Sequence, residues 1–95
     1  MNGEQQFHAL LDRVGARDWN AGAAHREAIL AEVRDLIVHG EMGVALENLC
    51  QSLYEYDVAL DAEDLAAIRF IANTMQMPRS TWDFLAGGTD DTSGH

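Results

Sequence analysis

GEMGVALENLCQSLYEYD, residues 40 to 57, predicts a helix together with the chain reversal in front of it. Apolar side chains at three- and four-residue spacing are typical of a helix with one buried face. In this stretch the centre of that face is formed by Met42, Leu46, Leu49 and Leu53. Gly40 suits the left-handed backbone that often ends a helix, so we expect the new helix to run from about Glu41 to Tyr56. Gly43 lies near the inward face and is expected to allow close approach of a neighbouring backbone.

The segment before Gly40 is predicted to complete a hairpin of two antiparallel helices. Its helix should run from about Ala23 to Gly40, and the short link to the next helix places the two side by side. The buried face of this helix is predicted to contain Ile29, Val33, Leu36 and Ile37, with Leu30 at its border. A first helix is expected over residues 4 to 14, with Gly15 as its stop.

The segment after residue 57 predicts a fourth helix and a final turn. Asp61 is the expected N-cap of a helix of roughly 15 residues, and Asp64 at N3 makes a weaker form of the capping box. Pro78 should end this helix or its extension, because the residue before a proline is pushed out of the α region. Ser80 is expected to cap a short last turn that covers Phe70. The apolar side chains of that turn are Trp82, Phe84 and Leu85.

The predicted fold class is all-α, because helical spacing recurs along the chain and strict two-residue alternation is absent. We expect a compact bundle of four helices with a short C-terminal fifth turn and a disordered tail. The chain of 95 residues suits one small domain, predicted for residues 1–86. Residues 87–95, GGTDDTSGH, are predicted to be a flexible polar tail. Trp19 is expected to close one end of the bundle, and Cys50 to be a small buried apolar residue.

Apolar runs and bulk charge limit the classes of partner. No run approaches the roughly 18 to 20 apolar residues of a membrane helix, and MNGEQQFHALLDR at the N-terminus does not resemble a signal peptide. We therefore expect a soluble cytoplasmic protein. Sixteen acidic residues against six Arg and no Lys give a net charge of −10. Such a chain repels nucleic acid and anionic membranes, so neither is expected as a direct partner.

The acidity is concentrated in the middle quarter of the chain. Residues 1 to 40 contain six acids and four Arg, and residues 65 to 95 contain three acids and two Arg. Residues 41 to 64 contain seven acids and no basic residue. These acids are Glu41, Glu47, Glu55, Asp57, Asp61, Glu63 and Asp64. A surface shaped only for solubility usually mixes both signs, so this excess indicates a function for the quarter that carries it.

Residues that could perform catalysis or bind metal do not form a recognisable pattern. The histidines, at positions 8, 25, 39 and 95, form no spacing that places two ligands on one helix face. The acidic segment DVALDAED has Ala62 where an EF-hand loop requires Gly. No serine lies in a Gly-flanked elbow, and no Gly-rich loop follows a strand. We therefore predict no enzymatic activity, no cofactor and no metal site.

The outward face of the helix over residues 41 to 56 is the predicted partner-binding site. Its candidate residues are Val44, Glu47, Asn48, Gln51, Tyr54, Glu55 and Asp57. The acids on this face meet no base one helical turn away, and aromatic residues lie beside them. Such a surface suits a basic protein partner, with Tyr54, Tyr56 and Val44 as candidate anchors. The alternative is an ordinary hydrated face whose two tyrosines are half-buried core residues.

Three segments of the chain together resemble the MafI-type immunity proteins of bacterial polymorphic toxin systems. They are HGEMGVALENLCQSLYEYD, LDAEDLAAIRFIANTM and PRSTWDFL, in that order and spacing within residues 39 to 85. The resemblance implies a small cytoplasmic protein that binds a cognate toxin domain and blocks it in the producing cell. It also implies that the toxin domain is often a nuclease. The contact residues above come from the helical wheel and the charges, because partners differ within the family.

Two functions follow as hypotheses. The first is an immunity protein that neutralises a basic toxin domain by stoichiometric binding. The second is a small acidic helical interaction or regulatory domain that self-associates or bridges other proteins through the side of Phe70 and Trp82. The sequence leaves the activity of the toxin, the surface of the toxin that is covered and the oligomeric state open.

Overall fold

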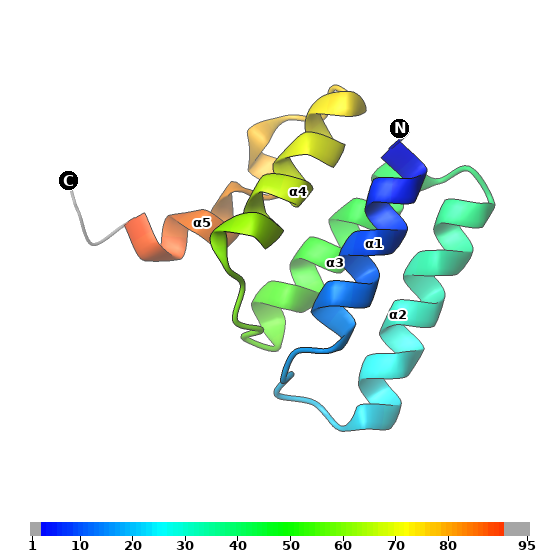
Figure 1. Cartoon of the computed structure of the whole chain (residues 1–95), viewed down its shortest axis with the longest axis vertical. Coiled ribbons are helices and arrows are strands. Elements are labelled where there is room, and N and C mark those ends of the chain that lie inside the picture. Colours follow the sequence, from blue (N-terminus) through cyan, green and yellow to red (C-terminus); the bar gives the residue numbers. More distant parts are fainter. Residues whose placement is uncertain (1–2, 91–95) are drawn as a thin grey trace.

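The computed structural model of the chain describes residues 3 to 90 and is a bundle of helices (Figure 1). Its elements in chain order are α1 (Gly3–Gly15), α2 (Ala23–Val38), α3 (Met42–Glu55), α4 (Ala62–Thr74), the 3₁₀ turn η1 (Arg79–Thr81) and α5 (Asp83–Asp90). Residues 3 to 90 contain no strand, which confirms the all-α prediction. None of the helices in this range has both the length and the apolar character that a membrane span requires.

Two helix pairs make the main contacts of the bundle. α2 and α3 form the predicted hairpin, and α1 packs along α4. α1 also contacts α2 and so joins the two pairs, with α2 on one side of it and α4 on the other in Figure 1. η1 and α5 pack against α3. The outward surface of α3 therefore lies between α2 and the η1–α5 segment.

The core is built from the apolar faces of α1 to α4. Its fully buried large side chains are Phe7, Leu10, Leu11, Val14, Val33, Leu46, Leu49, Leu53, Ile68 and Ile71. The stripe predicted on α3 is thus correct, although Met42 at its start is only partly buried. Trp19 is buried as predicted, and its indole Nε1–H donates to the carbonyl oxygen of Val14 at 2.9 Å. Cys50 is buried as well.

The reversal after α2 follows the prediction made from Gly40. Gly40 has φ +80°, and its N–H donates to the carbonyl of Ile37 at 3.0 Å. The N–H of Glu41 donates to the carbonyl of Leu36 at 2.8 Å. These two bonds form a Schellman motif, which satisfies the last carbonyls of α2 and lets α3 begin at once.

α3 and α4 end with the same motif but without glycine. Asp57 has φ +52° and Gln76 has φ +58°, so both occupy the left-handed region that glycine adopts most easily. After α3, the N–H of Val58 donates to the carbonyl of Leu53 at 3.0 Å; after α4, the corresponding bond joins Met77 to Ala72 at 2.9 Å. Neither left-handed position was predicted, because the sequence signal for such a helix end is a glycine.

The predicted capping box at the start of α4 is present. The N–H of Asp64 donates to Asp61 Oδ1 at 2.8 Å, and the N–H of Asp61 donates to Asp64 Oδ2 at 3.1 Å. Two of the unpaired N–H groups at this helix end are therefore satisfied by side chains. The helix itself is 13 residues long and ends at Thr74, before Pro78 can affect it.

Two details of the predicted packing are wrong. The buried face of α2 is centred on Leu30, Val33 and Ile37, whereas Ile29 and Leu36 are only partly buried. Leu30 is drawn inward because α2 packs on α1 as well as on α3. Gly43 does not meet a neighbouring backbone: a Cβ built there would lie 3.9 Å from the side chain of Met77, an ordinary contact distance.

The C-terminal segment differs from its prediction. Pro78 is the N-cap of η1, so Ser80 lies inside that turn and does not cap it. Trp82 is buried, but Phe70 remains 48% exposed, so the last turn does not cover Phe70 as expected. α5 extends to Asp90, four residues past the boundary predicted at residue 86. The rest of the predicted tail, residues 91–95, lies outside the described residues.

Candidate functional site

The candidate partner-binding residues are all exposed. Six of them lie on α3, and the seventh, Asp57, follows its C-terminus. Among the apolar and aromatic members, Val44 is 43% exposed and Tyr54 is 64% exposed. The predicted exposure of this surface is therefore correct, while its role in binding stays a prediction. We call Glu47, Asn48, Gln51, Tyr54 and Glu55 the α3 face.

Gln51 is the centre of the α3 face, because three shallow hollows meet at it. Towards α2, it shares a hollow with Asn48, Glu55 and residues of that helix, including Glu32. Towards η1 and α5, it shares a second hollow with Glu47, Pro78, Ser80, Thr81 and Phe84. The third hollow is lined by Gln51, Tyr54, Glu55 and Phe84. The structure thus brings the five residues of the α3 face together, whereas Val44 lines none of these three hollows.

The carboxylates on and beside the α3 face carry uncompensated negative charge. Within residues 3–90, none of Glu32, Glu47, Glu55 and Asp57 forms an ion pair. Arg79 lies between two residues that line the hollow beside Glu47, yet it makes no ion pair with any described carboxylate. Such a surface attracts a partner of positive charge.

An aromatic pair stands at the end of the α3 face. The rings of Tyr54 and Phe84 meet edge to face, with centroids 5.3 Å apart. Phe84 belongs to α5 and was predicted only as a buried side chain, but it is half-buried and lines the same hollow as Tyr54. The two residues are 30 positions apart, so no local pattern could have joined them.

Tyr56 is not available as an anchor, although the sequence made it a candidate. Its hydroxyl lies 2.8 Å from Nε2 of His25, and its ring stacks on Trp19 with centroids 6.3 Å apart. Both contacts belong to the end of the bundle that Trp19 closes. Tyr56 therefore stabilises the fold, and Tyr54 is the tyrosine that faces solvent.

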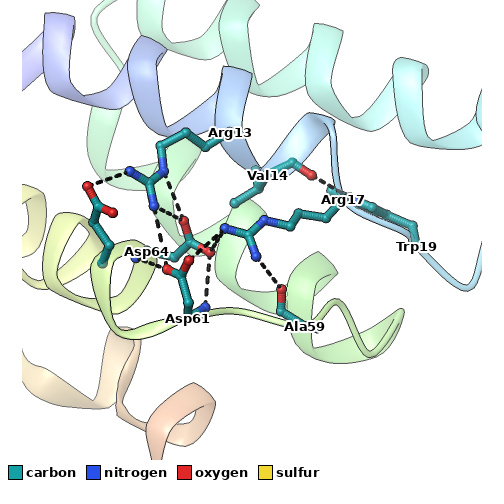
Figure 2. A network of polar contacts seen from close by, with 8 residues as sticks. Arg13, Val14, Arg17, Trp19, Ala59, Asp61 and Asp64 are labelled. Atoms are coloured by element: carbon teal, nitrogen blue, oxygen red, sulfur yellow. Dashed lines mark hydrogen bonds and ion pairs between the residues drawn. The ribbon is translucent and has the colours of Figure 1, made fainter.

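Three of the seven acids in the middle quarter are paired with arginines of α1 and of the loop after it. Arg13 Nη2 lies 2.9 Å from Asp64 Oδ1, and Arg17 Nη2 lies 2.7 Å from Asp64 Oδ2. Arg13 also pairs with Glu63 at 3.0 Å, and Arg17 with Asp61 at 3.1 Å (Figure 2). We call these five residues the Arg–Asp cluster.

Asp64 is the centre of the Arg–Asp cluster. Its side chain is fully buried, while both guanidinium groups remain partly exposed. Figure 2 shows Arg13 and Arg17 reaching the carboxylates of Asp61 and Asp64 from the end of α1 and the loop after it. Arg17 also donates to the carbonyl oxygen of Ala59 at 3.4 Å. The cluster therefore fixes the end of α1 to the start of α4.

The hydrogen bonds of the cluster shift the pKa of its members. The backbone N–H of Asp64, followed by the guanidinium of Arg17, lowers the pKa of the Asp61 carboxyl. Hydrogen bonds to Glu63 and then to Asp64 raise the pKa of Arg13. Both shifts favour the charged form of the group. These carboxylates are consequently occupied within the fold and are poor candidates for a partner.

Two further observations concern the metal-ligating side chains and the cysteine of residues 3–90. No group of three or more His, Cys, Asp or Glu residues within residues 3–90 is arranged to hold a metal ion. Burial raises the pKa of the Cys50 thiol to about 12, so at neutral pH the thiol carries its proton and is a weak nucleophile. Comparison with protein-family models, curated proteins and solved structures yields no match to the chain.

Proposed function

We propose that this chain is an immunity protein that binds a cognate toxin domain in the cytoplasm of the producing cell and neutralises it. The inhibition is stoichiometric, and the chain performs no catalysis of its own. The observation that carries the proposal is the contrast in pairing: the carboxylates of the α3 face form no ion pair with any described cation, whereas Asp61, Glu63 and Asp64 are held by arginines. The resemblance of residues 39 to 85 to MafI-type immunity proteins supports the same function.

The chemistry of the partner follows from the charge of this surface. A toxin that cleaves nucleic acid must attract phosphates, so it presents Lys and Arg around its active site. Glu47 and Glu55 are exposed and unpaired, and they can meet those side chains without breaking any described ion pair. Complementary charge speeds the encounter of the two proteins and favours one orientation. A basic toxin domain, of nuclease type, is therefore the proposed partner.

Tight inhibition also needs an apolar anchor, because exposed charges at the rim of an interface add little affinity. Tyr54 meets this need: it is 64% exposed and stands at the end of the α3 face. Its ring contacts Phe84, which restricts the side chain and lowers the entropy that binding would cost. Tyrosine is among the residues that most often dominate binding energy in protein interfaces.

The test is co-purification of this chain with the C-terminal domain of the large secreted protein that we expect its upstream neighbour gene to encode. Glu47→Lys combined with Glu55→Lys should lower the affinity at least about tenfold and abolish protection from the toxin, with an unchanged melting temperature. Affinity is measured by isothermal titration calorimetry, and protection by survival of cells that express the toxin domain.

The matched control is Glu4→Lys combined with Asp18→Lys, which changes the net charge by the same amount. Both residues are exposed and belong to α1 and the loop after it, and α1 packs mainly on α2 and α4. This variant should keep the affinity within about threefold of the original chain, because the charges lie away from the contact and are screened by salt. Equal losses in both variants would mean that bulk charge, and not the α3 face, governs binding.

Self-association is the second candidate function, and one observation favours it. Phe70 on α4 leaves 48% of its area in contact with solvent, so its ring is accessible to a second molecule. Trp82 cannot contribute as first expected, because it is buried. Light scattering over a concentration series tests this function: a stable homo-oligomer that Phe70→Ser dissociates would support it, and a monomer at all concentrations would exclude it.

A further inference from the structure

A cleft lies beside the α3 face. It has a volume of about 730 Å³ and lies between the C-terminal end of α3, the start of α4 and α5. Most of its lining is apolar: Leu53, Val58, Leu60, Leu65, Phe84 and Leu85. Asp57 and Asp61 also line it, and of these two only Asp61 is paired with an arginine.

Tyr54 and Phe84 form a ridge between two different environments. On one side they line the apolar cleft, and on the other they line the hollow that contains Gln51 and Glu55. The edge-to-face contact at 5.3 Å makes the two rings one continuous wall. An apolar space and an acidic space are thus separated by the width of one aromatic pair.

We propose that this ridge receives a loop or helix end of the toxin domain in which an apolar side chain stands next to an arginine. The apolar side chain enters the cleft beside Leu65, and the guanidinium group lies over the ring of Tyr54 and pairs with Glu55. This inference rests on the proposed function and specifies which part of the partner binds to this surface. Arginine suits the site better than lysine, because its planar group stacks on an aromatic face and bonds a carboxylate with two N–H groups.

Charge argues for a basic partner at this ridge and against a second copy of the chain. A copy would bring a net charge of −10 towards unpaired Glu55 and Asp57. Like charges that meet across an interface cost free energy, so self-docking here is unfavourable. The volume of the cleft admits an apolar side chain together with part of the backbone that carries it.

The inference can be tested without the toxin. Nuclear magnetic resonance titration of the ¹⁵N-labelled chain uses the blocked tetrapeptide Ala-Leu-Arg-Ala as the probe. Chemical-shift changes should concentrate at Tyr54, Leu65 and Phe84. Replacing the arginine of the peptide by citrulline, which has the same shape without the charge, should weaken binding about two- to fivefold. Replacing its leucine by glycine should weaken binding by a similar factor or more, since a buried leucine side chain is lost.

Variants of the protein locate the effect. Tyr54→Ala should reduce the preference for arginine over citrulline to the part that Glu55 supplies, and it should not unfold the chain because Tyr54 is mostly exposed. Phe70→Ala is the control, since it deletes a comparably exposed aromatic ring from α4 and should leave the titration unchanged. The inference is wrong if the three peptides bind equally, if no shift occurs, or if the shifts spread evenly over the acidic residues.

The two proposals fail in different ways. If the toxin domain co-purifies with the chain but Tyr54→Ala leaves its affinity unchanged, the ridge inference fails and the proposed function stands. If the peptide is recognised at the ridge but the toxin domain never co-purifies, the proposed function fails. In that case the ridge still identifies an arginine-containing segment as the ligand of this surface.

Discussion

Two acidic regions that are neighbours in the sequence have opposite environments in the fold. Asp57, which follows the α3 face, lies four residues before Asp61, the first acid of the Arg–Asp cluster. In the first region the carboxylates are exposed and have no described cation partner, whereas in the second Asp64 is fully buried between two arginines. Removing a carboxylate that is paired and buried destabilises the fold, whereas one that is exposed and unpaired is available to a partner.

This comparison shows that the local charge of a sequence does not tell how the charge is used. The acids of both regions lie in a stretch without any basic residue, so their sequence neighbours predict the same role for all of them. The pairing arises because Arg13 on α1 meets Asp64 across 51 positions of the chain. Only the packing of α1 along α4 separates the acids that support the fold from those left for binding.

The largest expected effect is the loss of the centre of the Arg–Asp cluster. Asp64→Ala removes two ion pairs and half of the capping box while both guanidinium groups stay in place. We expect the free energy of unfolding to fall by about 3 kcal/mol, near the lower end for a broken buried pair because the arginines are partly exposed. Urea denaturation measures this change. Glu47→Ala on the α3 face is the control and should change stability by less than about 0.5 kcal/mol. A loss under about 1 kcal/mol in Asp64→Ala would contradict the structural role of the cluster.

Salt should affect the two regions differently: it should slow association with the proposed partner and leave the stability of the chain unchanged. Raising the ionic strength from about 0.1 to 1 M shortens the screening length from about 10 to 3 Å. The association rate with a basic toxin domain should then fall at least about tenfold, because steering by the exposed acids is screened. The melting temperature of the chain alone should not fall, since the Asp64 carboxylate is fully buried and is therefore screened much less. Stopped-flow mixing and thermal scans measure the two quantities, and a salt-independent association rate would contradict charge steering.

The sequence predicted features that depend on neighbours along the chain. The hairpin at Gly40, the buried stripe of α3 and the cap at Asp61 each follow from residues within a few positions of one another. Prediction from the sequence was incomplete where distant segments meet. The contact of Phe84 with Tyr54 and the burial of Leu30 depend on how the helices pack. The exposure of the α3 face could be predicted because an amphipathic helix has one buried and one exposed side. The sequence could not predict which acids remain without an ion pair.

The left-handed end of α3 offers a smaller test. Asp57 and Gln76 occupy equivalent positions after α3 and α4, with φ of +52° and +58°. Asp57→Gly and Gln76→Gly should each raise the free energy of unfolding by about 0.5–1 kcal/mol, because glycine adopts this backbone without strain. Only Asp57→Gly also removes an unpaired carboxylate beside the cleft.

We therefore expect Asp57→Gly to stabilise the chain and to weaken toxin binding, while Gln76→Gly only stabilises it. Chemical denaturation and calorimetry on the same samples compare the two variants. This outcome would indicate that the strained aspartate serves binding at a cost in stability. Unchanged binding in Asp57→Gly would remove Asp57 from the interface and confine the contact to the α3 face.

The smallest expected effect is on the pH dependence of the free energy of unfolding. The backbone N–H of Asp64 and the guanidinium of Arg17 lower the pKa of Asp61, so Asp61 loses its proton more readily in the folded chain than in the unfolded chain. Its contribution is therefore present above the pKa of the unfolded carboxyl and is lost as the pH falls through the lower, folded pKa. Asp61→Asn should flatten the loss of stability below about pH 4, where an ordinary aspartate begins to take up its proton.

The control is the combination of Glu47→Gln and Glu55→Gln. It should leave the loss of stability below about pH 4 unchanged, because those carboxylates form no described ion pair. Denaturation curves between pH 2 and 7 measure both, and if the α3-face variant flattened the acid limb instead, the assignment of the stabilising charges to the Arg–Asp cluster would be wrong.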